Sequence, residues 1–137
     1  MMSRFAFHPE NLFGFSTIFG LKAQDCREAR VLELGCKSGH ELIAFASQYP
    51  NSEFIGIDPS DIAIEDAQKN IEALRLKNIR FYCLNLDDAT IETFGLFDYI
   101  IVNNVFSLVE TSAQKALFTC CQKNLKEYGV AYVSHNT

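Results

Sequence analysis

Residues 31–39, VLELGCKSG, and residues 54–60, FIGIDPS, decide the fold of this chain. The first stretch predicts a short buried strand, a tight glycine turn at 35–39 and a helix over residues 40–49. The second predicts another apolar strand, which ends at an acid, Asp58. This order of strand, glycine turn, helix, strand and acid is typical of open α/β sheets that hold a ribose and its base at the carboxyl ends of their strands.

Apolar strand patterns and amphipathic helix patterns alternate along the rest of the chain, with short loops between them. With 137 residues and 48% hydrophobic content, the chain is large enough for one domain with a real core. We therefore predict a single α/β domain over residues 1–137, with a Rossmann-like, doubly wound parallel sheet in a three-layer αβα arrangement. The expected further strands are 79–84, 98–102 and 130–134, and the expected further helices are 11–21, 61–76 and 112–128, the last ended by Gly129.

The amino-acid composition of the chain limits the partners and cofactors that it can be expected to bind. The net charge of -5 lacks the basic footprint of a nucleic-acid-binding protein, and no apolar run is long enough for a signal peptide or a membrane span, so we expect a cytoplasmic protein. Five cysteines show no C-x-x-C spacing, which predicts reduced, buried thiols and no metal site. A dinucleotide fingerprint starting at Gly35 would need glycines where Lys37 and His40 stand, which opposes a nicotinamide-dependent oxidoreductase.

The segments HPENL, VLELGCKSGHELIAFA, FIGIDPS, LKNIRF, FGLFDYII and NLKEYGVAYVSHNT resemble the class I S-adenosylmethionine-dependent methyltransferases, in the branch that carries an additional regulatory domain. In motif I of that family an acid precedes spaced glycines, and these fall on Glu33, Gly35 and Gly39, with Lys37 in place of the middle glycine. The resemblance implies S-adenosylmethionine as cofactor. It also implies that this chain is the N-terminal portion of a longer protein.

The resemblance further implies that the last two strands of the class I fold are missing here. The outer edge of the strand over 130–134 would then be unpaired, and an apolar edge strand invites pairing. We expect this edge to be covered by a missing C-terminal region or by a second chain in a homodimer.

By the same resemblance, the donor would be held by the glycine turn and by the acid after the second strand. Glu33 would orient the turn or bind the amino group of the donor, or else be a solvated acid. Asp58 would accept from both ribose hydroxyls, or else only cap the helix that follows. The turn also contributes Gly35, Cys36 and Gly39, while Pro59 and Ser60 would shape the pocket floor.

The loop after the third predicted strand supplies the expected adenine contacts. Asn85 falls where the family usually has an acid that accepts from the adenine amine, and an amide oxygen can accept the same hydrogen bond. Leu86 follows it in the pocket wall. Asp87 takes the role of Asn85 if the register is shifted by two, and ordinary turn chemistry is the alternative for the whole loop.

The methyl acceptor would approach the ends of the fourth and fifth predicted strands. Asn103 and Asn104 open an NNVF segment that lacks both prolines of the N-P-P-[YF] signature and the His-Gly pair of the closer relatives, while Asn103 would also contact the cofactor. His135 on the same rim would relieve an amine acceptor of its proton, unless it is only a solvated terminal residue. Lys37 would either obstruct the donor or extend its ammonium into water.

Two functions remain open from the sequence. The first is methyl transfer to an amine acceptor, with protein lysine as an acceptor that some relatives use. The alternative is a degenerate, non-catalytic cofactor-binding or interaction module of the same fold, indicated by Lys37, Asn85, the NNVF segment and the missing strands.

Overall fold

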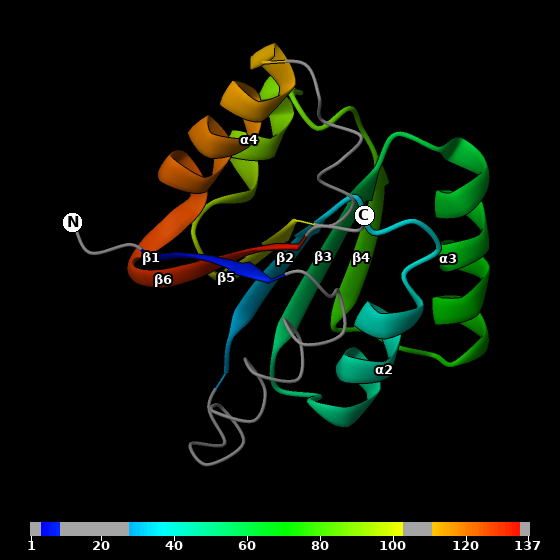
Figure 1. Cartoon of the computed structure of the whole chain (residues 1–137). Coiled ribbons are helices and arrows are strands. Elements are labelled where there is room, and N and C mark those ends of the chain that lie inside the picture. Colours follow the sequence, from blue (N-terminus) through cyan, green and yellow to red (C-terminus); the bar gives the residue numbers. More distant parts are fainter. Residues whose placement is uncertain (1–3, 9–27, 103–110, 135–137) are drawn as a thin grey trace.

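The computed structural model describes residues 4–8, 28–102 and 111–134. Six parallel strands form one sheet in the order β1-β6-β5-β2-β3-β4 (Figure 1). The bounds of the strands are β1 Arg4–His8, β2 Arg30–Leu34, β3 Glu53–Asp58, β4 Ile79–Cys83, β5 Phe97–Val102 and β6 Leu125–Ser134. The five strands from β2 to β6 confirm the predicted Rossmann-like α/β sheet, because the chain runs outward from β2 in both directions.

Helices cover both faces of this sheet. The bounds of the helical elements are α2 His40–Gln48, α3 Asp61–Ala73, the 3-10 helix η1 Ala89–Phe94 and α4 Thr111–Asn124. Figure 1 shows α2 and α3 on one side of the sheet and α4 on the other. The predicted three-layer αβα arrangement is thereby confirmed. The helix expected over residues 11–21 lies outside the described residues.

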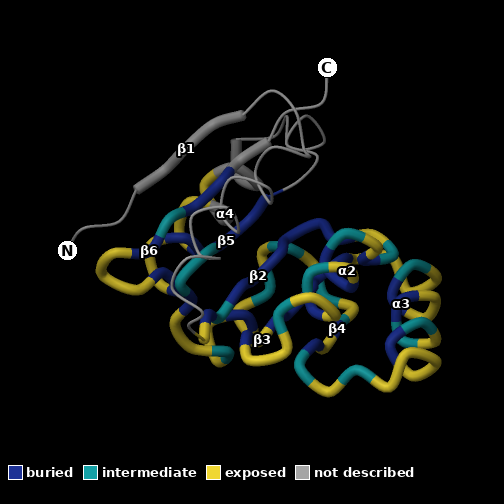
Figure 2. Tube along the Cα trace, turned by 90° about the horizontal axis from the view of Figure 1, so that it is seen from below, coloured by how far each residue is buried: buried dark blue, intermediate teal, exposed yellow. Residues whose placement is uncertain are grey.

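Side-chain alternation divides the core into two layers. Val31 and Phe54 pack toward α2 and α3, while their neighbours Leu32 and Ile55 pack toward η1 and α4. Successive strand residues point to opposite faces, so each central strand supplies both layers. Figure 2 shows these central strands as the most buried part of the molecule. Glu33 shares the parity of Val31 and therefore lies on the α2 and α3 face.

The edge of β6 is not open, which corrects the expectation from sequence. β1 pairs with it in parallel, from Arg4 opposite Val130 to His8 opposite Ser134. The prediction was wrong because a five-residue strand that pairs with a segment far away in the sequence has too weak a local pattern to be recognised. Within the described residues, β6 therefore needs neither a second chain nor a later strand to cover this edge.

The boundary between α4 and β6 also differs from the prediction. The helix ends at Asn124 rather than near Gly129, and Leu125 already pairs with Phe97 of β5. The buried Asn124 side chain donates to the carbonyls of Ile91 at 3.1 Å and Gly95 at 2.7 Å. These bonds hold the end of α4 against η1, and β6 begins at the next residue. The register then shifts, so that Val130 is the next partner, opposite Tyr99.

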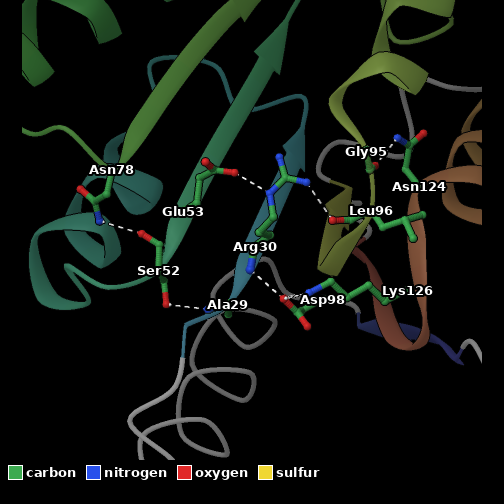
Figure 3. A network of polar contacts seen from close by, with 10 residues as sticks. All are labelled: Ala29, Arg30, Ser52, Glu53, Asn78, Gly95, Leu96, Asp98, Asn124 and Lys126. Carbon is green, nitrogen blue, oxygen red and sulfur yellow. Dashed lines mark hydrogen bonds and ion pairs between the residues drawn. The ribbon is translucent and has the colours of Figure 1, made fainter.

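A polar network closes the amino end of the sheet (Figure 3). The Arg30 side chain donates to Glu53 at 2.5 Å and to the Leu96 carbonyl at 2.9 Å, and its guanidinium lies 4.4 Å from the centre of the Phe97 ring. Asp98 accepts from the Arg30 backbone at 2.8 Å and from Lys126 at 3.1 Å. These contacts join β2, β3, β5 and β6 at the end opposite to the predicted site.

Two other expectations concern the membrane and the thiols. No helix in the described part of the chain is both long and apolar enough to cross a membrane. Cys36, Cys120 and Cys121 are free and buried, as predicted, whereas Cys83 is free but exposed. Burial raises the pKa of the Cys120 thiol to about 11 and that of Cys121 to about 12, which keeps both thiols protonated at neutral pH. Cys26 lies outside the described residues.

Candidate functional site

The residues predicted to bind a cofactor gather at the carboxyl ends of β2, β3 and β4. In a doubly wound sheet this edge forms a crevice, because neighbouring strands send their connections to opposite faces. The chain order reverses at β2, whose neighbours are β3 and β5. The turn after β2 therefore lies at the position where such sheets bind nucleotides.

The turn from residue 35 to residue 39 follows β2 directly and starts α2. Its backbone has positive φ at Gly35 (81°), Lys37 (55°) and Gly39 (71°). Gly35 N and Cys36 N both donate to the Ile57 carbonyl, at 2.8 and 3.1 Å, so the turn is held against β3. Lys37 thus adopts the left-handed conformation that the family's middle glycine would adopt freely.

Asp58 links this turn to the segment after β3. One carboxylate oxygen, Oδ2, accepts from Lys37 N at 2.9 Å, and the other, Oδ1, accepts from Ser60 N at 2.9 Å. The residue is 8% exposed. Its helix-capping alternative is wrong, because Ser60 is the N-cap of α3 and accepts from Ala63 N at 3.2 Å. Each carboxylate oxygen can accept a second hydrogen bond, so Asp58 retains capacity for a ligand.

Glu33, at the end of β2, is buried rather than solvated, which rejects that alternative. Its pKa lies well above the ordinary value, because of desolvation first and the nearby Glu41 and Asp58 second. The Lys37 ammonium acts in the opposite direction and lowers this pKa. Burial also raises the pKa of Glu41, in the first turn of α2. Three acids therefore lie around the glycine turn. The sequence did not predict Glu41 as a site residue, because its only signal was its place in the first turn of the helix.

Phe81 of β4 packs against two glycines of the site. A Cβ added at Gly56 would lie 2.6 Å from the Phe81 ring atoms Cδ1 and Cε1 and 3.0 Å from Cys36 Sγ, and one added at Gly39 would also meet that ring. Phe81 is 3% exposed and has little room to move. Both positions therefore require glycine, because the ring occupies the space that a Cβ atom would need. Through Gly39 the ring also packs against the turn.

The loop after β4 is exposed at Asn85 and half-buried at Leu86. It is a turn in which Asp88 N donates to the Asn85 carbonyl at 3.0 Å, and the Asp88 side chain accepts from Thr90 N at 2.8 Å to start η1. The turn-chemistry alternative is therefore correct for Asp88. The loop stays beside Asp58, whose carbonyl accepts from Leu84 N at 3.2 Å.

The structure brings together nearly all of the predicted cofactor residues. The residues predicted to meet the methyl acceptor lie outside the described part of the chain. Asp58 and Glu33 are buried, while Pro59 and Ser60 are exposed beside them. Cys83, which the sequence reasoning did not assign, also lies here, with its thiol 3.5 Å from the Pro59 carbonyl. Asn103, Asn104 and His135 lie outside the described residues, so their predicted roles stay predictions.

A doubly wound sheet with a glycine turn, a buried acid after the next strand and an exposed loop after the third defines a Rossmann-like domain with a site for a nucleoside cofactor. The model of a family described as a methyltransferase domain matches residues 26–137. The chain therefore belongs to the class I S-adenosylmethionine-dependent methyltransferases.

Three relatives illustrate this membership. A Rickettsia prowazekii protein, RP789, is 42% identical over 130 residues, or 95% of this chain. A second protein of that organism, RP028, is 35% identical over an equal share. The solved structure of PKMT2 from Rickettsia typhi in complex with AdoHcy (S-adenosylhomocysteine) matches 77% of this chain with a TM-score of 0.71 and 35% identity. The matched part is 23% of RP789, 52% of RP028 and 20% of the PKMT2 chain.

Proposed function

We propose that residues 1–137 act as one methyltransferase domain that binds S-adenosylmethionine at the carboxyl ends of β2, β3 and β4. The observation that carries this proposal is the position of Asp58, a buried acid that ends β3 and accepts from the backbone of the glycine turn after β2. Asp58 therefore brings the glycine turn after β2 and the acid at the end of β3 together at one site. When bound, S-adenosylmethionine supplies an activated methyl group on a sulfonium.

The residues present suit that molecule. The spare acceptor capacity of Asp58 suits the two ribose hydroxyls, with Pro59 and Ser60 beside them. The buried Glu33 suits the amino group, and the backbone of Gly35, Cys36 and Gly39 suits the methionine portion. Asn85 and Leu86 are the proposed adenine contacts, since the Asn85 side chain is exposed on the adjoining loop.

Catalysis in this proposal is mainly positioning. Holding donor and acceptor in line is worth roughly 7 to 11 kcal/mol, without a covalent nucleophile from the protein. Asn103 and Asn104 are proposed to receive the acceptor and His135 to take its proton. We propose an amine acceptor, the side chain of a protein lysine, because some members of the family that the sequence resembles use this acceptor and the chain is similar to the structure named PKMT2.

Calorimetric titration of the chain with S-adenosylmethionine, AdoHcy and NAD tests the cofactor. The first two are expected to bind and NAD is not. Asp58→Ala should weaken binding by more than about 100-fold, since two charge-assisted hydrogen bonds are lost at about 1.5 to 3 kcal/mol each. The exposed neighbour variant Asp61→Asn is the matched control and should bind normally. Circular dichroism shows whether Asp58→Ala keeps the fold.

Binding of none of the three ligands would favour the non-catalytic module, and binding of NAD alone would favour an oxidoreductase. The acceptor is tested separately, with labelled S-adenosylmethionine and paired peptides that differ only in lysine against arginine. Mass spectrometry should place the methyl group on lysine. Methylation of both peptides at a carboxylate or hydroxyl oxygen would overturn the amine acceptor while leaving the cofactor site intact.

A further inference from the structure

Lys37 stands at a position where its backbone conformation is costly. Its φ of 55° lies in the left-handed region, between two glycines of the same turn that also have positive φ. This conformation is sterically unfavourable for a residue with a side chain, whereas glycine adopts it freely. Glycine at this position would form the same turn more easily. Formation of the turn therefore does not explain why residue 37 is a lysine.

The backbone of Lys37 is fixed and its side chain is not. Its N–H donates to Asp58 Oδ2 at 2.9 Å, which anchors the Cα atom at the rim of the site. The side chain is exposed. The ion pairs found among the described residues are Arg30–Glu53, Lys69–Glu65, Lys123–Glu92 and Lys126–Asp98, and Lys37 takes part in none of them.

Acidic side chains outnumber basic side chains around the glycine turn. Glu33, Glu41 and Asp58 are acids, and the Lys37 ammonium lowers the pKa of Glu33 against the larger raising effects of desolvation, Glu41 and Asp58. His40, exposed at the start of α2, is the other basic side chain of this segment. The first turn of α2 has no side-chain cap, whereas Ser60 caps α3 and Asp88 caps η1. Lys37 therefore supplies an exposed cationic side chain at the turn.

The proposed ligand has two opposite charges on its amino-acid end. The Asp58 carboxylate beside the turn attracts the α-ammonium but would repel the α-carboxylate. We propose that Lys37 is a positioning and specificity-determining residue that pairs with the α-carboxylate of the methionine portion of S-adenosylmethionine and AdoHcy. This inference rests on the proposed function. It predicts selection for ligands that carry the intact amino acid.

Calorimetry with two ligands and three variants tests this pairing. The ligands are AdoHcy and its decarboxylated analogue, which keeps the amine and lacks the carboxylate. Lys37→Ala removes the ammonium but keeps a Cβ at the same φ, so it does not relieve the backbone. Lys37→Arg keeps a positive charge, and Lys37→Gly removes both the charge and the backbone cost.

Lys37→Ala and Lys37→Gly should weaken AdoHcy binding about tenfold, while Lys37→Arg should stay within about threefold of the unmodified chain. The decarboxylated analogue should bind Lys37→Ala as well as it binds the unmodified chain, because no pair is lost. Raising the salt concentration should weaken AdoHcy binding more in the unmodified chain than in Lys37→Ala.

An equal loss for both ligands in Lys37→Ala would mean a merely structural role and would overturn the inference. Unchanged AdoHcy binding in Lys37→Ala would overturn it as well, with the proposed cofactor site left standing. If the unmodified chain binds neither S-adenosylmethionine nor AdoHcy, the proposed function fails and the inference fails with it.

Discussion

The Asp58 carboxylate accepts a hydrogen bond from the backbone N–H of Lys37 at 2.9 Å. The acid that ends β3 thereby holds the glycine turn that follows β2, 21 residues earlier in the chain. Since Asp58 also accepts from Ser60 N, one side chain orders both segments of the candidate site before any ligand binds. Such preorganisation lowers the ordering cost of binding.

The buried Glu33 predicts a pH-dependent stability. Its raised pKa means that the folded chain keeps a proton that the unfolded chain releases above about pH 4.5. The stabilisation is complete below that pH and is lost as the pH rises through the raised pKa, by at most about 1.4 kcal/mol per pH unit. Glu33→Gln should flatten this part of the curve and make the chain more stable than the unmodified chain at neutral and higher pH.

Urea unfolding at several pH values between 5 and 8.5 measures this dependence. The exposed Glu72→Gln is the matched control and should retain the slope of the unmodified chain. The same slope in Glu33→Gln would show that Glu33 is ionised in the fold and that the linkage belongs to another group, such as Glu41.

Gly56→Ala is expected to destabilise the fold by about 1 to 3 kcal/mol, because the new methyl group would collide with the buried Phe81 ring. The double variant Gly56→Ala with Phe81→Leu should cost less than the two single changes added together, since the smaller side chain leaves space for the methyl group. Denaturant unfolding of all three variants gives the coupling. Strictly additive losses would mean that the ring is not the obstacle.

Asn124→Ala should destabilise the chain by about 2 to 4 kcal/mol. The variant removes two hydrogen bonds to the Ile91 and Gly95 carbonyls and leaves these acceptors without their donor. Gln122→Ala, at an exposed position of the same helix, is the control and should change stability by less than about 0.5 kcal/mol. Thermal unfolding compares the two, and similar midpoints would contradict a role for Asn124 in joining α4 to η1.

Removal of residues 1–8 should expose the outer edge of β6. The amides between Val130 and Ser134 would lose the partner strand β1 and exchange faster with solvent. Hydrogen exchange measured by mass spectrometry tests this, with peptides from β3 as the internal control. Light scattering should show that the shortened chain associates more readily. Unchanged exchange in β6 would mean that β1 does not protect this edge.

The sequence by itself determined the five-strand Rossmann-like sheet, the glycine turn and the acid at Asp58, because these depend on local period, turn chemistry and fixed spacing. Tertiary structure alone decided the pairing of β1 with β6 and the early end of α4 at Asn124, because both depend on partners far away in the sequence. The burial of Glu33 and the hydrogen bond from Lys37 N to Asp58 were decided in the same way. A carboxylate's neighbours, and therefore its protonation, exist only once distant strands lie side by side.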